Sequence, residues 1–305
     1  MLARGIADSF ARTIGETFGV AGLEWLQRLP SLVDEYARRW SLVVGLPFDR
    51  LSYNWVAPAQ RADGSQSVLK AGFPRPELSL EIAALRSCAG RGSVLLLEAS
   101  QATGVLLLER LMPGTPLSKE GDHRKAISTA VSVMRRLWSP AAEKSEFPSI
   151  AAWTQGLGQL RRRYQGGTGP LPARLVDAAE SLVTELLSSA TAPVLLHGDL
   201  HLENILAAER EPWIAIDAKG VIGEPACEVG ALVRDLWKRS PAQACTKLPL
   251  AHQLDQFADE LGLDRSRIVG WALVQAVLSG WWSLEDHGRG WESAITCAEA
   301  LSQLK

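Results

Sequence analysis

The stretch His197-Gly198-Asp199-Leu200-His201-Leu202-Glu203-Asn204-Ile205-Leu206 is the part of this 305-residue chain from which its fold can be inferred. A second stretch, Ile214-Ala215-Ile216-Asp217-Ala218-Lys219-Gly220, follows after a short interval. Apolar residues at 194–196 precede the first stretch and Trp213 precedes the second. This pattern predicts short buried strands that hold polar groups at their ends or in the turns that follow.

Three oxygen-bearing side chains in these stretches have the order and spacing that phosphoryl transfer needs. Asp199 would accept the proton of an attacking hydroxyl, while Asn204 and Asp217 would hold Mg²⁺ against nucleotide phosphates, as in the catalytic and metal-binding segments of protein kinases. Mg²⁺ suits one or two side-chain oxygens completed by phosphates and waters. The spacing therefore predicts a kinase.

Neighbouring residues are expected to complete this site. His197 is expected to be a buried, hydrogen-bonded member of the catalytic set beside Asp199, and Ile216 is assigned to the nucleotide site. Lys219 could reach the transferred phosphoryl group or could pair with Glu224, and the sequence leaves both open.

An alternative interpretation starts from the alternation of His197, Asp199 and His201. Imidazole and carboxylate suit transition metals, so H-x-D-x-H could be the ligand set of a metal-dependent hydrolase. The other three histidines do not cluster with acids in a comparable motif. This argues against the hydrolase.

Composition limits the classes of partner. The chain is 47% hydrophobic with a formal charge of −2 and no long run of either sign, so we expect a small-molecule partner, no nucleic acid and no membrane. Its first residues lack the apolar core of a signal peptide, and the apolar stretch 271–282 is too short to span a bilayer. The cysteines show no paired spacing, which is typical of reduced thiols and predicts a cytoplasmic protein: Cys88, Cys227, Cys245 and Cys297.

Hydrophobic periodicity predicts an α+β chain in two lobes. Apolar repeats that start with Ile6 and Leu26 predict two helices at the N-terminal end of the chain. A β-hairpin is predicted between residues 51 and 70 and ends in a lysine. A helix over 77–88 and strands over 94–98 and 104–111 follow. The remainder is mostly helical, over 124–138, 150–164 and 173–189 and from 228, 252, 265 and 291 onward. We expect a small antiparallel-sheet lobe at 1–111 and a helical lobe with the catalytic loop, metal site and acceptor pocket at 112–305.

The sheet lobe should supply the nucleotide contacts. A kinase needs a strand lysine to neutralise the α- and β-phosphates and a helix carboxylate to hold it, and Lys70 and Glu81 occupy those places. The connector between the lobes would bind the adenine edge through backbone groups of Glu109 and Leu111. Asn54 lies in a segment that offers hydroxyl and amide donors but lacks G-x-G, which disfavours a protein substrate.

The two stretches, extended to Gly223-Glu224-Pro225-Ala226-Cys227-Glu228, resemble the aminoglycoside phosphotransferases. The upstream segments at residues 53–56, 81–85 and 90–94 resemble the streptomycin 6-kinase and hydroxyurea kinase branch of this family. The resemblance covers nearly the whole chain and implies a two-lobed protein-kinase-like fold, ATP with Mg²⁺, and transfer of the γ-phosphate to a hydroxyl of an aminoglycoside such as streptomycin, with antibiotic resistance as the outcome. Proline commonly follows the metal-binding aspartate in this branch, where this chain has Ala218.

The acceptor implied by the resemblance is a small cationic molecule. Guanidinium groups pair with carboxylates and stack on aromatic faces. The helical lobe offers both kinds of group: Glu224, Glu228, Asp235, Trp281 and Trp282, with Glu285 and Asp286 beside the tryptophans. Because neighbours on a helix cannot face one way, at least one of the two tryptophans is expected in the core.

Two other functions remain open from the sequence. The same catalytic set would serve a kinase of another metabolite hydroxyl, such as a choline, homoserine or sugar-like acceptor. A nucleotide-binding pseudokinase is the alternative from a different class. The retention of Lys70, Asp199, Asn204 and Asp217 weighs against it.

Overall fold

The computed structural model describes residues 7–49, 51–142, 145–239 and 247–304. The chain divides into two compact units, Met1–Gly114 and Thr115–Lys305, and each is described by itself. Unit 1 is built on an antiparallel sheet and unit 2 is mostly helical, so the predicted α+β class is confirmed.

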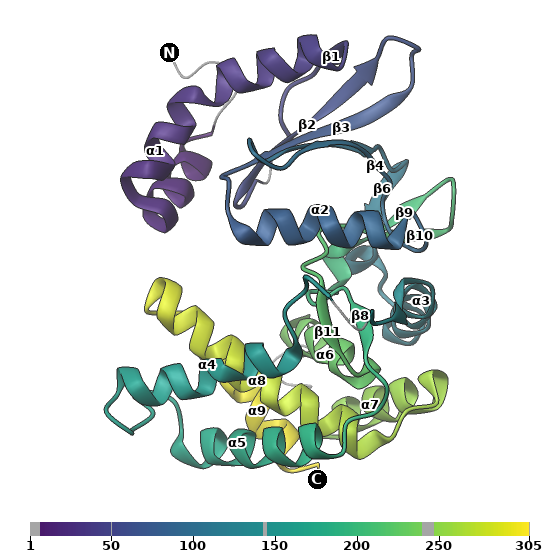
Figure 1. The fold of residues 1–305 in the computed structure, drawn as a ribbon. Helices are drawn as coiled ribbons and strands as arrows, with labels where there is room; N and C mark the ends of the chain where they lie inside the picture. Colours follow the sequence, from purple (N-terminus) through teal and green to yellow (C-terminus); the bar gives the residue numbers. More distant parts are fainter. Residues whose placement is uncertain (1–6, 50, 143–144, 240–246, 305) are drawn as a thin grey trace. The chain divides into compact units, whose positions relative to one another are not determined.

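Five strands form the sheet of unit 1 in the order β1-β2-β3-β5-β4 (Figure 1). The predicted hairpin is β2 and β3, and its turn is stabilised by Asp63, whose carboxylate accepts the backbone N–H of Ser65 at 2.9 Å. Lys70 lies within β3, two residues before the strand ends. The bounds are β1 Leu42–Val44, β2 Asn54–Arg61, β3 Gln66–Gly72, β4 Leu96–Ser100 and β5 Val105–Glu109.

The helix α1 (Asp8–Arg39) covers one face of this sheet. Alternate strand residues such as Trp55, Leu69 and Leu107 are buried in one cluster with Phe10 and Trp25 of α1. Their spacing by two along each strand places them on one face. The core of unit 1 therefore lies between α1 and the sheet.

The two predicted leading helices form α1, which is interrupted at Gly19. Gly19 has φ +59° and ψ −141°, a conformation that residues with a Cβ rarely adopt. The helical path therefore breaks there and resumes toward Leu26. The first predicted position of the repeat, Ile6, lies outside the described residues.

The helix α2 (Pro76–Cys88) carries the helical period predicted for 77–88. Pro76 suits its first turn, where the missing N–H costs nothing, and Ala89 ends it in the left-handed conformation. Its buried side includes Leu78, Ile82 and Leu85 and also Glu81. The charged Glu81 is thus held inside unit 1, where it can meet a buried partner from the sheet.

Unit 2 is organised around α8, whose contacts extend to α4, α5, α6, α7 and α9. Nearly every residue of α8 from Ile268 to Leu278 is buried, as expected of a helix that is surrounded on all sides. The predicted helices are present, with ends that differ by a few residues. Their bounds are α3 His123–Leu137, α4 Ile150–Arg163, α5 Ala173–Ser188, α6 Val229–Arg239, α7 Lys247–Leu261, α8 Arg265–His287 and α9 Glu292–Ser302.

Short strands and single helical turns connect these helices. They pair as two three-stranded sheets, β10-β9-β6 and β11-β8-β7, which the sequence predicted only around the two motif stretches. The strands are β6 Pro113–Pro116, β7 Ser139–Pro140, β8 Val194–Leu196, β9 Ile205–Ala208, β10 Trp213–Ala215 and β11 Val221–Gly223. The turns are η1 Leu117–Lys119, η2 Leu202–Asn204 and η3 Pro225–Glu228.

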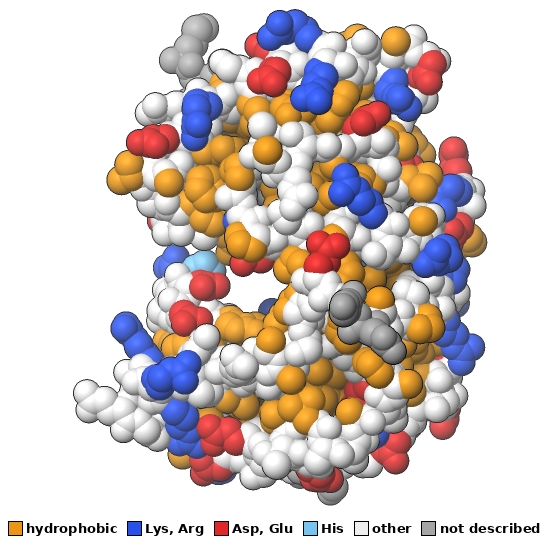
Figure 2. Space-filling model, in the orientation of Figure 1, with side chains coloured by type: hydrophobic (Ala, Val, Ile, Leu, Met, Phe, Trp, Pro, Cys, Tyr) orange, Lys and Arg blue, Asp and Glu red, His pale blue; other side chains and the backbone are white. Residues whose placement is uncertain are grey.

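Surface charge and cysteine state can be compared with the expectations from composition. On the face in Figure 2, Lys and Arg are interspersed with Asp and Glu among the side chains that the structure describes. Cys88, Cys227 and Cys297 are free and buried, and Cys245 lies outside the described residues. Among the helices of the described segments, none combines the length and the hydropathy that a membrane span requires.

Candidate active site

The two motif stretches meet through β9 and β10. These strands pair antiparallel, and the backbone N–H of Ile216 donates to the carbonyl of Asn204 at 2.9 Å. Asp199 follows β8 by three residues, Asn204 precedes β9, and Asp217 follows β10 by two residues. The polar groups therefore stand at strand ends, as predicted.

His197 ties the catalytic loop to the segment before Asp217. Its Nε2 donates to the carbonyl of Ile216 at 2.8 Å, and its Nδ1 accepts the backbone N–H of Asp199 at 3.2 Å. Burial lowers the pKa of His197 to about 4, so the imidazole is neutral, as this pair of bonds requires. Both ring nitrogens are engaged within the protein, which leaves none for a metal ion.

Asn204 and Asp217 fit the requirements of Mg²⁺. The amide nitrogen of Asn204 donates to the backbone carbonyl of Asp199 at 3.0 Å, which orients the amide and turns its oxygen the other way. Asp217 has φ +61°, a left-handed conformation that aspartate tolerates better than most residues. One amide and one carboxylate oxygen, completed by phosphates and waters, is a donor set that suits Mg²⁺. Within the described segments, no three His, Cys, Asp or Glu side chains gather as a metal-binding group.

Glu228 anchors the backbone of the catalytic loop. Its carboxylate accepts the N–H of His197 at 2.6 Å and that of Gly198 at 2.9 Å, and only 2% of the residue is exposed. Burial raises the pKa of Glu228 to about 7. Both oxygens of this buried carboxylate thus accept a backbone N–H group. These bonds favour a positioning role for Glu228 over the substrate contact that the sequence predicted.

Asp235 and Glu224 are also committed to the protein. Asp235 accepts the N–H of Leu202 at 3.0 Å and pairs with Arg239 at 3.1 Å, which fixes the start of η2. Glu224 forms a two-pronged pair with Arg267 at 2.7 and 2.8 Å and also accepts the indole N–H of Trp271. These placements speak against the acceptor contacts that the sequence predicted for both carboxylates.

Lys219 is positioned by the loop that follows Asp217. Its backbone N–H donates to the carbonyl of His197 at 2.8 Å, and its side chain is half-buried. Glu224 pairs with Arg267 instead, which argues against the alternative in which Lys219 pairs with Glu224.

Glycine is required at position 198 because neighbouring side chains leave little room for a Cβ. It has φ +84°, and an added Cβ would lie 3.0 Å from Cη2 of Trp153 and 3.1 Å from Cγ1 of Val221. Trp153 of α4 is thus a direct neighbour of the residue before Asp199. No pattern in the sequence predicted this contact, because 45 positions separate the two residues along the chain.

The predicted tryptophan pair divides as expected. Trp281 is buried with 2% exposure, whereas Trp282 is half-buried and meets Trp153 edge to face, with ring centroids 5.8 Å apart. Gly156 of α4 lies beside this pair, and a Cβ there would be tightest against Cδ2 of Leu278, at 3.0 Å.

Arg234 of α6 was also missed by the sequence argument. Its guanidinium donates to the side-chain oxygen of Gln275 at 3.2 Å. Burial lowers the pKa of Arg234, and the carboxylates of Asp199 and Asp235 oppose that shift. The arginine therefore adds a positive charge to the surroundings of Asp199.

Unit 1 contains the predicted lysine and carboxylate as a buried ion pair. Nζ of Lys70 lies 2.6 Å from Oε1 of Glu81, and the side chains are 3% and 9% exposed. Asn54 opens β2 opposite Gly72, and its side-chain oxygen lies 2.4 Å from the Cβ position of that glycine. The pair is the arrangement that a phosphate-binding lysine needs, because the carboxylate holds the ammonium in place.

The predicted connector residues lie at and beyond the end of β5. The backbone N–H of Glu109 donates to the carbonyl of Leu95 at 2.9 Å, and its carboxylate accepts the N–H of Leu95 at 3.0 Å. Leu111 is buried with 8% exposure. The amide of Glu109 is thus bonded within unit 1.

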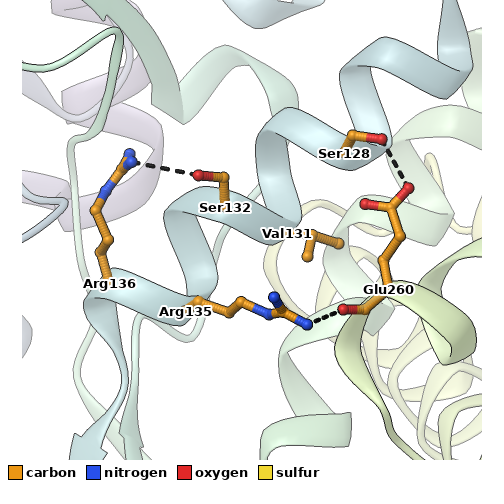
Figure 3. Close-up of a pocket in the computed structure, with 6 residues that line it drawn as sticks. All are labelled: Ser128, Val131, Ser132, Arg135, Arg136 and Glu260. Carbon is orange, nitrogen blue, oxygen red and sulfur yellow. Dashed lines mark hydrogen bonds between the residues drawn. The ribbon is translucent and has the colours of Figure 1, made fainter.

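A separate hollow lies on unit 2 between α3 and α7 (Figure 3). Its polar groups bond to one another: Ser128 donates to the Glu260 carboxylate at 2.7 Å, and Arg135 donates to the Glu260 carbonyl. Arg136 pairs with Glu211 at 3.0 Å. None of the residues predicted for the site lines this hollow.

Sequence comparison gives the relationships of the whole chain. The family described as "Aminoglycoside/hydroxyurea antibiotic resistance kinase" matches residues 39–287. A streptomycin 6-kinase of Streptomyces griseus is 32% identical over 98% of this chain and 96% of its own length. A hydroxyurea phosphotransferase of Kitasatospora aureofaciens is 35% identical over 88% of this chain and 77% of its own length.

Comparison with solved structures confirms the predicted kinase-like fold. Aminoglycoside phosphotransferase APH(4)-Ia, solved as a thermostable mutant with ADP and hygromycin B, matches with a TM-score of 0.64 at 13% identity and covers 90% of this chain and 97% of that one. The choline kinase LicA of Streptococcus pneumoniae matches with a TM-score of 0.63 at 13% identity, over 90% and 98%. At this identity the likeness is one of fold.

Proposed function

Because the chain belongs to the aminoglycoside/hydroxyurea antibiotic resistance kinases, we propose that it transfers the γ-phosphate of ATP to a hydroxyl of streptomycin. The observation that carries the proposal is the catalytic loop, in which Asn204 and His197 both bond to the backbone of Asp199. The streptomycin 6-kinases at 31% and 32% identity over almost the whole chain support streptomycin as the acceptor.

In the proposed reaction, Asp199 receives the proton of the acceptor hydroxyl. The hydroxyl oxygen forms a bond to the γ-phosphorus, the bond from that phosphorus to the β,γ-bridging oxygen breaks, and ADP leaves. Asp199 then releases its proton to solvent. Glu228 and His197 act through the backbone of Gly198 and Asp199, since both hold this loop by hydrogen bonds.

The nucleotide is proposed to bind the residues that the sequence assigned to it. Lys70, held by Glu81, would neutralise the α- and β-phosphates, and backbone groups of Glu109 and Leu111 would meet the adenine edge. Asn204 and Asp217 would hold Mg²⁺, which neutralises charge on the phosphates when it is bound. ATP is a cytoplasmic substrate, so we place the enzyme in the cytoplasm.

Hydroxyurea is the second candidate acceptor, favoured by the relative at 35% identity. It also presents a hydroxyl, so the same catalytic set would serve it. The two acceptors differ in size and charge, and a direct comparison separates them. Phosphorylation of streptomycin would add up to about two negative charges, which would weaken its binding to an anionic ribosomal RNA target.

A coupled assay of ADP formation tests the function. Purified protein is given ATP and Mg²⁺ with streptomycin, hydroxyurea, other aminoglycosides or small amino alcohols, and the product is identified by mass spectrometry. We expect streptomycin-dependent turnover with a mass gain of one phosphoryl group, and its loss in Asp199→Asn. Turnover with another acceptor but none with streptomycin would reject the assignment, and no acceptor-dependent turnover would favour a pseudokinase.

A further inference from the structure

Trp153 and Trp282 together form an aromatic pair that starts at the catalytic loop. Cη2 of Trp153 lies 3.0 Å from the Cβ position of Gly198, directly before Asp199. Trp282 continues the pair, with an interplanar angle of 87° to Trp153. Both rings are half-buried, unlike their neighbour Trp281, which is in the core. An indole that keeps part of its surface exposed beside a catalytic loop is available to a ligand.

Carboxylates accompany this pair on the last turns of α8. Glu285 follows Trp282 by three residues, which places both on one side of the helix. Within the described segments, neither Glu285 nor Asp286 forms an ion pair with an Arg or Lys side chain. The pKa of Glu285 is raised by burial and then by the charge of Asp286, with only partial opposition from Arg163. This end of α8 therefore has negative charge that a cation could neutralise.

The other acidic residues of the predicted acceptor set do not compete for this role. Glu224 and Glu228 are buried with 4% and 2% exposure, and Asp235 uses both oxygens within the protein. Aromatic faces beside carboxylates are the combination that binds planar cations, because the ring attracts the charge and the carboxylate accepts its N–H groups.

We propose that Trp153 and Trp282 form the surface on which the planar cationic group of the acceptor lies, and that Glu285 pairs with that group. The proposal rests on the proposed function, since it names the part of the same site that selects the acceptor. The chemical class it selects is a hydroxylated ring that carries guanidinium or amino groups. Contact with Trp153 would bring such a ring next to Asp199, where a hydroxyl can react.

Steady-state kinetics of Trp282→Leu and Trp282→Phe test this proposal. In Trp282→Leu, loss of the aromatic face should raise the KM for streptomycin by about tenfold. In Trp282→Phe, most of this rise should be absent, as expected for a cation over a ring. Trp237→Leu is the matched control, because Trp237 is also a half-buried tryptophan of unit 2 and bonds to Thr296 of α9. The control should leave the KM for streptomycin within about twofold.

A structural role would give a different result. If Trp282 only supports the fold, Trp282→Leu would change the KM for ATP and the KM for streptomycin together, phenylalanine would restore both, and the proposal would be overturned. An unchanged KM for streptomycin in both variants would also overturn it. The expected result is a rise confined to the acceptor, with a smaller rise of the same kind in Glu285→Gln.

Binding measurements separate this proposal from the proposed function. Streptomycin is titrated by calorimetry into Asp199→Asn and into the double variant Asp199→Asn/Trp282→Leu. Weaker binding in the double variant by about tenfold supports the aromatic surface even if the wild type transfers no phosphate. Equal binding, or no binding to either protein, overturns it. If the wild type transfers phosphate but the two variants bind streptomycin equally, the proposed function is supported and the aromatic surface is rejected.

Discussion

At the scale of single residues, the loop that carries Asp199 is held by hydrogen bonds from two buried side chains. Glu228 accepts two backbone N–H groups of the loop, and His197 links Asp199 to Ile216. Each of these side chains is almost completely buried, so bulk water cannot replace it as a bonding partner. The position of Asp199 therefore depends on two buried titratable residues.

Those two residues should make stability depend on pH in opposite directions. His197 has a pKa of about 4 against an ordinary 6.5, so between these values the unfolded chain binds more protons and stability falls as pH falls. Glu228 has a pKa of about 7 against an ordinary 4.5, so between these values the folded chain binds more protons and stability falls as pH rises. The two effects oppose each other across the window that they share.

Single variants should reveal each slope. Relative to wild type, His197→Gln should lose stability as pH rises from 4 to 6.5, and Glu228→Gln should gain stability as pH rises from 4.5 to 7, by about 1 to 3 kcal/mol across each window. Urea unfolding at closely spaced pH values measures the differences. Curves that run parallel to that of the wild type would contradict the assigned protonation states.

Gly198 gives a second prediction at this scale. Gly198→Ala should lower the free energy of unfolding by about 1 to 3 kcal/mol and also lower kcat, because a Cβ is strained at this φ and would press on Trp153. Gly166→Ala is the matched control, since Gly166 has φ +90° with open space around it. Gly166→Ala should lower the free energy of unfolding by about 1 kcal/mol and leave kcat unchanged. Equal effects of both variants on kcat would show that Trp153 does not constrain the loop.

At the scale of elements, α8 connects the segment after Asp217 to the helical core. Arg267 on its first turn pairs with Glu224, which directly precedes η3, and η3 ends at Glu228. The exposed fractions of the Arg267 and Glu224 side chains are 18% and 2%. Breaking such a pair leaves a charge with little access to water, which is costly.

Glu224→Gln should therefore lower the free energy of unfolding by about 3 kcal/mol, since Arg267 would lose its charged partner. The KM for streptomycin should stay within about twofold, because Glu224 is bonded within the protein. Thermal unfolding and steady-state kinetics of the variant measure both quantities. A raised KM with unchanged stability would restore the acceptor contact that the sequence suggested for Glu224.

At the scale of the whole molecule, local patterns predicted the helices and most of the strands, though not β1, β6 or β7, and they placed Asp199, Asn204 and Asp217 at strand ends, where the structure has them. They could not predict what the other acids do, because those contacts join distant parts of the chain. Glu228 bonds to His197 from 31 residues away, and Glu224 bonds to Arg267 from 43. A carboxylate in a sequence looks the same whether it will bind a ligand or hold a loop. Trp153 was missed for the same reason.

If Lys70 and Asp199 act on one nucleotide, the effects of their variants on kcat/KM should not be additive. Lys70→Met and Asp199→Asn should each lower kcat/KM by about 10² to 10⁴-fold. The kcat/KM of the double variant should be no more than about tenfold below that of the less active single variant. Lys125→Met, which alters an exposed lysine of α3, should change kcat/KM by less than about twofold. Losses that multiply in the double variant would mean that Lys70 and Asp199 contribute independently. Non-additive losses would be those of two parts of one catalytic set, which is the behaviour that direct transfer from one bound nucleotide requires.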